Sequence, residues 1–483
     1  MKEIDIIEYI KNKSEEYEDI AEQIKAQNPE TIAMFKIVED FLKKSKRVCY
    51  GGTAINNILP EKARFYNPKT DIPDYDFFSP DPIGDCKKIV QQYVKVGYTN
   101  VEAKPGVHKG TMKVFINFIG VADITFIPRK FYKKLMDVSI FKNNIYYAHP
   151  NFLRMSIYNE LSRPKGDVSR WNKVYSRLLL LNKYYPIEIS KKLEKSIQRF
   201  RHHIEKEEVG DIIWNSVVNK FIMTNNLVLF GLKLNRLYQN ILENLNVNIA
   251  NYFSDSKNIV LNYSILSDDA KNDAERLAIE LESSTGLKTN IIKHEGLGEI
   301  LEEHYEIEIF MPNSDNIRNI FMYQTIYCSS YYEIEFDRKT HQKINIASIE
   351  TCLHYYFTFT LAEREYYDPE QILYLCDKLI RLSSKFDLLT KKGIDPYPYT
   401  CIGKEYTKEE MLERTQYKRK ELRKNKEDPL YDFYFFKYRL EDALKDLDIK
   451  LNSSTLSSSS DKTATSIKNK IKSKKQSKRK ISK

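Results

Sequence analysis

YGGTAINNIL at residues 50–59 and DYDFFSPDP at residues 74–82 decide the fold of this chain of 483 residues. In the first stretch, an apolar run that ends at Tyr50 meets two glycines and then the pattern of an amphipathic helix. In the second stretch, Asp74 and Asp76 lead an apolar run that is typical of a short strand. A strand, a glycine turn, a helix and a further strand predict an α+β domain.

The flanking sequence extends this domain in both directions. Helical periodicity over residues 4–44 is broken at Asn28-Pro29-Glu30, which predicts two helices. A tight turn at Gly120 is expected between two of the later strands. From residue 148 to 185 the pattern is helical again, with Asp167 as the expected N-cap. The expected strands cover residues 47–50, 75–79, 113–118 and 121–128.

Three aspartates are the best chemical signal. Residues two apart in a strand point to the same face, so Asp74 and Asp76 bring two carboxylates together, at a cost that a cation between them would remove. Asp123 lies in VADITFI, residues 121–127, which is otherwise typical of a buried strand, and an unpaired buried carboxylate is heavily penalised. Mg²⁺ prefers such oxygen ligands. The alternative is that Asp74 caps a turn and Asp123 pairs with a nearby lysine.

Gly51-Gly52-Thr53 lies between the first strand and its helix. Glycine lets a backbone approach a phosphate, the N–H groups at a helix start face an anion, and Thr53 adds a hydroxyl. A glycine pair before a helix is more often a tight turn. Because no lysine follows in the spacing of a P-loop, a P-loop ATPase is poorly supported.

The chain also resembles itself at three places. YGGTAINNIL is echoed by FGLKLNRLYQNIL at residues 230–242, and DYDFFSPDP is echoed by NYSILSDDA at residues 262–270. The helical stretch 167–185 is echoed at residues 368–386. The offset grows along the chain, which predicts a tandem repeat with longer loops in the second copy. There Asp74 corresponds to Asn262, Asp76 to Ser264 and Gly52 to Leu232, so the second copy lacks the acids.

Composition bounds the class of protein. The length and a hydrophobic content of 42% allow more than one core. The net charge is +10, but residues 452–483 hold ten Lys or Arg against one Asp, so the remainder is nearly neutral. This Ser- and Lys-rich end is expected to be a disordered tail. Six cysteines without a CxxC pair, no signal-like start and no long apolar run predict a soluble protein in a reducing compartment, without a membrane.

The glycine pair, the Asp-x-Asp strand and the third Asp resemble the nucleotidyltransferase superfamily of DNA polymerase beta. Within it, GGTAINNIL, IPDYDFFSPDP, VADITFIP and the Arg-Trp helix are similar to the catalytic subunit of poly(A) polymerases of large cytoplasmic DNA viruses, of the giant-virus type. The resemblance runs from about residue 47 to 185. One departure is the 21 residues between Gly52 and Asp74, which imply a loop inserted near residues 61–71.

This resemblance implies a fold and an activity. The expected fold is an α+β, polymerase beta-like domain with a mixed sheet and flanking helices, followed by a degenerate second copy. The expected activity is template-independent polyadenylation of mRNA 3′ ends, with ATP as substrate, RNA as acceptor and Mg²⁺ or Mn²⁺ as cofactor. Expected partners are a homodimer or a processivity subunit, at a cytoplasmic viral replication site or in the virion. The expected domains are 1–45, 46–190, 191–450 and 451–483.

The same resemblance assigns roles. Asp74 and Asp76 would hold both metals, and Asp123 would hold the catalytic metal and help to deprotonate the RNA 3′-hydroxyl. Gly51, Gly52, Thr53 and Lys173 are expected to bind the nucleotide. The open alternatives are uridylyl transfer, CCA addition, oligoadenylate synthesis or a non-catalytic RNA-binding scaffold, because base choice depends on pocket shape rather than on metal ligands.

Weaker candidates follow the acidic strands. Cations on the later helices could hold a triphosphate, and aromatic residues four apart could stack on adenine, but a solvated face and a packed core explain these patterns as well. The basic run TQYKRKELRKNK at residues 415–426, near the aromatic run LYDFYFFKY, could track an RNA backbone, although a charged helix face is more frequent. His202-His203 is the one adjacent pair of histidines, and no zinc spacing is present. The candidate cations and aromatic residues are Arg154, Arg170, Arg177, Trp171 and Tyr175.

Overall fold

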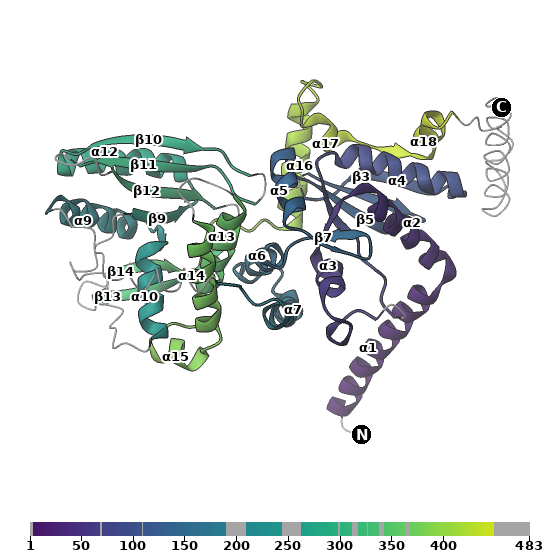
Figure 1. Cartoon of the computed structure of the whole chain (residues 1–483), viewed down its shortest axis with the longest axis horizontal. Coiled ribbons are helices and arrows are strands. Elements are labelled where there is room, and N and C mark those ends of the chain that lie inside the picture. The colour runs from purple at the N-terminus through teal and green to yellow at the C-terminus, as the bar shows by residue number, and fades with distance from the viewer. Residues whose placement is uncertain are drawn as a thin grey trace. The chain divides into compact units, whose positions relative to one another are not determined.

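A computed structural model of the whole chain forms two compact units, residues 1–149 with 406–483, and residues 150–405 (Figure 1). Each unit is an α+β body, as the sequence predicts. The structure describes residues 3–67, 70–108, 110–189, 209–243, 262–297, 300–311, 317–325, 327–337, 342–362 and 368–448. The basic tail and His202-His203 therefore lie outside the described residues.

The first unit is built on a sheet in the order β16-β3-β4-β5-β2-β1-β7-β6. Its first part contains α1 (Glu3–Gln27), α2 (Pro29–Ser45), β1 (Val48–Tyr50), α3 (Gly51–Ile58), β2 (Asp76–Ser79) and α4 (Pro82–Val96). The chain continues through β3 (Val101–Pro105), β4 (Thr111–Ile116), β5 (Ile119–Phe126), α5 (Arg129–Asp137), β6 (Ile140–Lys142) and β7 (Ile145–Tyr147). Its last part contains α16 (Lys408–Leu422), α17 (Tyr431–Phe435), β16 (Tyr438–Arg439) and α18 (Leu440–Asp446).

Two local signals in the first unit had different outcomes. The break between the first helices is confirmed, since the Asn28 side chain accepts the Glu30 N–H at 2.8 Å and Pro29 begins α2. The expected turn at Gly120 is wrong. Asn117 and Phe118 form the two-residue turn between β4 and β5, and their φ of 48° and 66° are both positive, as a type I′ hairpin turn requires.

The second unit has its own sheet, in the order β10-β11-β12-β9-β8-β14-β13-β15. It begins with α6 (Pro150–Leu161), α7 (Trp171–Tyr184), α9 (Val209–Thr224), β8 (Val228–Phe230), α10 (Leu232–Leu242), β9 (Asn262–Ser267) and α12 (Ala270–Thr285). The strands β10 (Lys288–His294), β11 (His304–Phe310), β12 (Ile317–Gln324), β13 (Ser329–Asp337) and β14 (Gln342–Ala347) follow. It ends with α13 (Ile349–Ala362), α14 (Pro369–Ser383), α15 (Phe386–Lys391) and β15 (Cys401–Ile402).

The two sheets are copies of each other. The run β3-β4-β5-β2-β1-β7-β6 matches the run β10-β11-β12-β9-β8-β14-β13 in spatial order and in the direction of every neighbouring pair. Finer contacts repeat too. Ser79 Oγ donates to Asp85 at 2.6 Å, as Ser267 Oγ does to Asp273. The predicted tandem repeat is confirmed.

The division of the chain differs from the expected boundaries near residues 190 and 450. Helices α6 and α7 belong to the second unit because α6 packs against α13 of the second copy, and α13 packs against α14. The segment after residue 405 belongs to the first unit because β16 pairs with β3. Asp167 was the expected N-cap of α7. Instead it precedes a 3₁₀ turn at Val168–Arg170, without a side-chain cap hydrogen bond.

Cysteine usage also differs from the expectation. Cys328 and Cys401 form a disulfide that joins the start of β13 to β15. The sequence contains no CxxC spacing that would have predicted this bond. The pair is distant in sequence and meets only through the sheet. The remaining cysteines are free and buried: Cys49, Cys86, Cys352 and Cys376. Within the described residues, no helix combines the length and apolarity that crossing a membrane requires.

The core of the second unit holds an acid. Glu350 is in the first turn of α13 and 4% exposed, and its Oε2 has no hydrogen-bond partner among the described residues. Burial raises the pKa of Glu350 from 4.5 to about 7, although its own backbone N–H and the Ser348 hydroxyl favour the charged form. Deprotonation therefore leaves a charge in an apolar interior.

Glu350 makes the stability of the second unit depend on pH. Because its pKa in the fold is raised, its stabilising contribution is complete below pH 4.5 and is lost as the pH rises through about 7. Replacement of Glu350 by Gln should remove this dependence and raise the unfolding free energy at pH 8 by roughly 3 kcal/mol, at 1.36 kcal/mol per pKa unit. Urea denaturation at pH 5 and pH 8 measures it. Glu370→Gln, at an exposed first-turn acid of α14, should change neither value.

Candidate active site

Three adjacent strands place Tyr50, Asp76 and Asp123 in one row. Tyr50 on β1 is opposite Asp76 on β2, and Asp76 is opposite Asp123 on the parallel strand β5. Directly paired residues share a face of the sheet, so the two carboxylates are neighbours. Both are partly exposed, and 23% of the Asp123 side chain is accessible. The two carboxylates in this row of central strands therefore form an acidic surface, called the acidic edge below, that a ligand can reach.

Asp74 approaches this row from outside the strand. It precedes β2, and its side chain is exposed. Its backbone N–H donates to Thr53 Oγ1 at 3.3 Å, and the buried Thr53 side chain belongs to the first turn of α3. The expected hydroxyl of Thr53 thus fixes the segment that carries Asp74. The sequence indicated a longer strand, with Asp74 already on the shared face.

Asp123 has a protein cation beside it. Lys113 on β4 is the strand neighbour of Asp123, and its Nζ is 2.5 Å from Asp123 Oδ2. The ion-pair alternative left open by the sequence is therefore realised for Asp123. Among the described residues, no three His, Cys, Asp or Glu side chains are gathered closely enough to hold a metal. The Lys113 side chain is 38% exposed, so its ion pair with Asp123 is weak. A divalent cation that competes for Asp123 therefore has only this weak ion pair to displace.

The charges of all three acids nevertheless act on one side chain, that of Tyr50. Burial, followed by the charges of Asp76, Asp123 and Asp74, raises the pKa of Tyr50 above its ordinary range. The Tyr50 hydroxyl shares a 2.8 Å hydrogen bond with Thr125 on β5. A single phenol therefore experiences the three carboxylates together, and an added divalent cation would relieve the same field. Oxygen donors of this kind fit Mg²⁺ or Mn²⁺.

Gly51 makes room for Asp76 at the start of α3. Its φ is +72°, and a Cβ built on it would lie 2.6 Å from Asp76 Oδ2. Tyr50 provides no side-chain cap to α3, and the first helical turn carries no acid. The backbone N–H groups of that turn are therefore suited to an anion beside the acidic edge. Gly52 lies in the same turn and is partly exposed, and its expected role in nucleotide binding stays a prediction.

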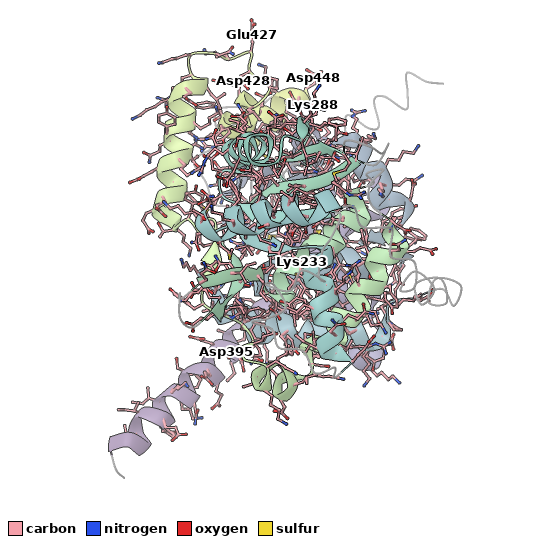
Figure 2. The ribbon with its side chains drawn as sticks, turned by 90° about the vertical axis from the view of Figure 1, so that its left-hand side faces the viewer. Lys233, Lys288, Asp395, Glu427, Asp428 and Asp448 are labelled. Carbon is pink, nitrogen blue, oxygen red and sulfur yellow. A yellow bond between two sulfur atoms is a disulfide. The ribbon has the colours of Figure 1, made fainter. Side chains whose placement is uncertain are left out.

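The second copy keeps the backbone arrangement of this site but lacks the acidic side chains. Gly231 has a φ of +78°, as Gly51 does, but Ser264 replaces Asp76 and Phe321 replaces Asp123 at the paired positions. Lys233 stands where the first copy has Thr53 and is labelled in Figure 2. Lys233 is 3% exposed, and burial lowers its pKa to about 8. Its Nζ is 3.4 Å from Tyr263 Oη, so an internal lysine occupies the start of α10.

The helical candidates have mostly structural roles. Arg154 is buried and holds the end of α7 by donating to Asn182 and to the Leu181 carbonyl. Burial lowers its pKa to about 10. Trp171 packs 5.5 Å from the Tyr397 ring, which favours the core interpretation. These corrections arise because sequence spacing alone does not reveal what covers a helix.

The remaining candidates stay predictions or change role. Lys173 is exposed on α7 in the second unit, and its relation to the acids of the first unit stays a prediction. Tyr175 is half-buried, Arg177 is buried, and Arg170 pairs with Glu160 at 3.2 Å. In the basic run of α16, Arg419 donates to the Tyr434 carbonyl at 3.1 Å, so part of that run packs against α17.

Two features of the site were missed by sequence reasoning. Counting back from the Asn117-Phe118 turn would place Lys113 opposite Ala122, and a register shift between Val114 and Phe115 moves it opposite Asp123, so sequence spacing alone does not give this pair. Asn56 in α3 holds the predicted loop, since its side-chain oxygen accepts the backbone N–H groups of Phe65 and Tyr66, each at 2.9 Å. A polar residue inside a helix carries no such signal in sequence.

The mixed sheet, the glycine turn and the acids on neighbouring parallel strands define a nucleotidyltransferase fold. Residues 36–167 match the family model described as the poly(A) polymerase catalytic subunit. The chain is 30% identical over 179 residues to a putative poly(A) polymerase catalytic subunit of African swine fever virus, isolate Pig/Kenya/KEN-50/1950. It is 30% identical over 192 residues to the one of Acanthamoeba polyphaga mimivirus.

These alignments cover 36% and 37% of this chain, and they span 37% and 32% of the relatives. Sequence similarity is therefore limited to about a third of either protein. The solved structure of the Megavirus polyadenylate synthase matches over 92% of this chain and 88% of its own, with a TM-score of 0.66 and 20% identity. That match shows that both units share its fold.

Gly51→Ala should disturb the acids because a methyl group would meet the Asp76 carboxylate at a strained φ. We expect a loss of about 1–3 kcal/mol in unfolding free energy. On the hypothesis that these acids catalyse nucleotidyl transfer, the rate of transfer should fall by about 100-fold, the order expected for small misplacements in an active site. Chemical denaturation and primer extension measure the two effects. Gly231→Ala is the matched control, since its Cβ would lie 2.7 Å from Ser264 Oγ, and it should cost stability with a smaller change in rate.

Lys113→Gln should strengthen binding of a divalent cation, because it removes the ion competing for Asp123. An exposed ion pair contributes up to about 1 kcal/mol, which corresponds to a gain of up to about fivefold in affinity. The shift of the thermal unfolding midpoint during a Mn²⁺ titration reports it. Lys104→Gln removes the neighbouring pair with Glu102 on β3 and should leave the titration unchanged. Unchanged or weaker Mn²⁺ binding by Lys113→Gln would contradict the competition.

Proposed function

We propose that this chain is a template-independent poly(A) polymerase, which transfers AMP from ATP to the 3′-hydroxyl of RNA and releases pyrophosphate. The observation that carries the proposal is the pairing of Asp76 with Asp123 beside the uncapped start of α3. The same frame in the second copy holds Ser264 and Phe321, so the acids are not required by the fold itself. The similarity of residues 36–167 to poly(A) polymerase catalytic subunits supports this choice of reaction.

The residues divide the work of an in-line displacement at the α-phosphorus. The first-turn N–H groups of α3 bind the triphosphate, and Gly51 leaves that backbone uncovered. Asp123 accepts the proton of the attacking RNA hydroxyl. Lys113, once displaced from Asp123, places a positive charge near the leaving phosphates. Attack and departure occur in one step, so no covalent link between enzyme and nucleotide is needed.

Asp76 and Asp123, with Asp74 joining them from its exposed segment, would hold divalent cations, Mg²⁺ or Mn²⁺, which would stabilise charge on the attacking and leaving oxygens. The strand pairing keeps Asp76 and Asp123 adjacent, and after burial the charges of all three carboxylates contribute to the raised pKa of Tyr50. The Thr53 hydroxyl maintains the position of the Asp74 backbone. Loss of that hydroxyl would therefore act on cation binding through Asp74.

The second copy has a supporting role in this proposal. The position equivalent to the acidic edge is filled by aromatic side chains, since Phe230 is 5.3 Å from Tyr323 and 5.4 Å from Tyr355 between ring centroids. Tyr355 belongs to α13, which packs against α6, and α6 packs against α7, the helix that carries Lys173. The RNA 3′ end and ATP are the proposed substrates. A cytoplasmic site of viral replication is the proposed location.

Primer extension tests this function directly. Purified full-length protein is offered a labelled oligo(A) RNA with Mg²⁺ or Mn²⁺ and each of the four NTPs in separate reactions. We expect elongation with ATP that falls by at least about 1000-fold in Asp76→Asn and Asp123→Asn, because ligands that act only in the transition state carry several kcal/mol. Ser264→Ala, at the position equivalent to Asp76, should retain normal elongation.

The outcomes separate the alternatives. Preference for UTP or CTP would replace adenylation with another tailing reaction. Incorporation that survives in both aspartate variants would remove the acids from the mechanism. RNA binding without incorporation by folded protein would favour the non-catalytic scaffold.

A further inference from the structure

The sheet of the first unit has one face that packs against helices and another that carries the acids. Helix α4 packs against β3, β4, β5 and β16, and Gln91 of α4 donates to Tyr438 Oη on β16 at 2.9 Å. Along β4, buried residues alternate with partly exposed ones, and the exposed ones share a face with Asp123. This face, called the open face below, presents Lys113 and Phe115 on β4, Glu102 and Lys104 on β3 and Arg439 on β16.

Two lysines on the open face are direct neighbours. Lys104 on β3 is paired with Lys113 on β4, and Lys113 is paired in turn with Asp123 on β5. Like charges directly opposite each other in a sheet are destabilising. Here Lys104 Nζ is 2.7 Å from Glu102 Oε2, and Lys113 Nζ is 2.5 Å from Asp123 Oδ2. A divalent cation at Asp123 would release Lys113 and leave two ammonium groups side by side, where an anion is favourable.

Arg439 adds a third cation at the edge of the open face. It is paired with Glu102, and its Nε and Nη2 donate to Glu102 Oε1 at 2.8 and 2.7 Å. Lys104 donates to the other oxygen of the same carboxylate. The hydrogen bonds from Lys104 and then Arg439 lower the pKa of Glu102. Because one acid serves two cations whose side chains are 43% and 58% exposed, a positive charge remains uncompensated at the surface.

An aromatic ring lies among these cations. Phe115 is partly exposed and is paired with Glu102, and Lys104 Nζ lies 4.7 Å from the centre of its ring. Proteins that hold single-stranded nucleic acids combine cations along the backbone with aromatic side chains on which bases stack. A phosphate that draws the Lys104 ammonium away would uncover the Phe115 ring for a base.

We infer that the open face binds the RNA acceptor behind its 3′ end, with a base stacked on Phe115 and phosphates bound by Lys104 and Arg439. The inference rests on the proposed function, which brings the RNA 3′-hydroxyl to Asp123. From there the path crosses β4 and β3 and ends on β16. At roughly 4.8 Å between neighbouring strands, three steps span about 14 Å. A stacked strand with a rise of roughly 3.4 Å per nucleotide places about four nucleotides on this path.

The inference gives β16 a role beyond completing the sheet. Lys104, Lys113 and Phe115 lie within residues 36–167, which match the family model, whereas Arg439 lies outside them. The segment that returns to the first unit after residue 405 therefore supplies the outermost phosphate contact. Arg439 and Lys104 are positioning residues, since they contact the acceptor away from the reacting atoms.

RNA binding without NTP tests the open face independently of catalysis. Fluorescence anisotropy of a labelled oligo(A) RNA with the full-length protein gives the affinity at several salt concentrations. The double variant Lys104→Gln, Arg439→Gln should bind at least about tenfold more weakly. Its plot of log affinity against log salt should be less steep by about 1.4, at about 0.7 per lost phosphate contact in a single strand. An unchanged affinity and slope would overturn the inference.

Matched variants control for charge and for folding. Lys36→Gln, Lys43→Gln removes two cations that share one acid, Glu39 on α2, and should leave both affinity and slope unchanged. Urea denaturation verifies that each variant is folded.

The stacking contact has its own test. Phe115→Leu keeps an apolar side chain but removes the ring, so oligo(A) binding should weaken by about tenfold with no change in the salt slope. Phe141→Leu, on the exposed ring of β6 at the opposite edge of the sheet, is the control and should bind normally. Normal binding by Phe115→Leu would remove the base from this ring and overturn that part of the inference.

Primer extension separates positioning from a general effect on the fold. In Lys104→Gln, Arg439→Gln the KM for RNA should rise by about tenfold, while kcat at saturating RNA and the KM for ATP stay unchanged. A fall in kcat with an unchanged KM for RNA would contradict the inference. If the unmodified protein extends RNA with none of the four NTPs, the proposed function fails, whereas the anisotropy measurement still decides whether the open face binds RNA.

Discussion

The pairing of β2 with β5 is the constraint on which the rest of the first unit depends. Parallel strands with Asp76 opposite Asp123 bring two carboxylates onto one edge, where their repulsion opposes folding. The fold offsets this repulsion with the Lys113 ammonium and with partial exposure to water. The glycine at residue 51 then allows the start of α3 to approach the same edge. Acids, helix start and lysine form one electrostatic unit.

Much of the structure of the first unit could be predicted from the sequence, because the patterns that specify it are local. The Asn28-Pro29 break, the glycine turn and the alternation around Asp76 each depend on residues within a few positions of one another. The repeat was also predictable, since YGGTAINNIL and FGLKLNRLYQNIL preserve a glycine that needs positive φ. The same alignment of the two copies predicted that the second copy lacks the acids. The strand register confirms the predicted place of Ser264, since Ser264 is paired with Phe230 as Asp76 is paired with Tyr50.

The rest depends on contacts between residues distant in the chain. Lys113 meets Asp123 only through a hairpin whose turn was placed at Gly120 instead of Asn117-Phe118. Arg154 was a candidate cation in the sequence, but in the structure its guanidinium donates to the Leu181 carbonyl near the end of α7. The disulfide between Cys328 and Cys401 has no spacing signature, because two strands bring it together. Packing, rather than periodicity, decides each of these cases.

The return of the chain to the first unit has a consequence for biogenesis. Strand β16, at Tyr438–Arg439, pairs with β3, at Val101–Pro105, after the whole second unit has been made. At roughly 5–20 residues per second, translation of the intervening segment takes on the order of tens of seconds. During that interval the β3 edge lacks its partner, and an uncovered strand edge is a template for association between nascent chains. Ribosome pausing or chaperone supply in this interval should govern the yield of native protein more strongly than it would for an uninterrupted domain.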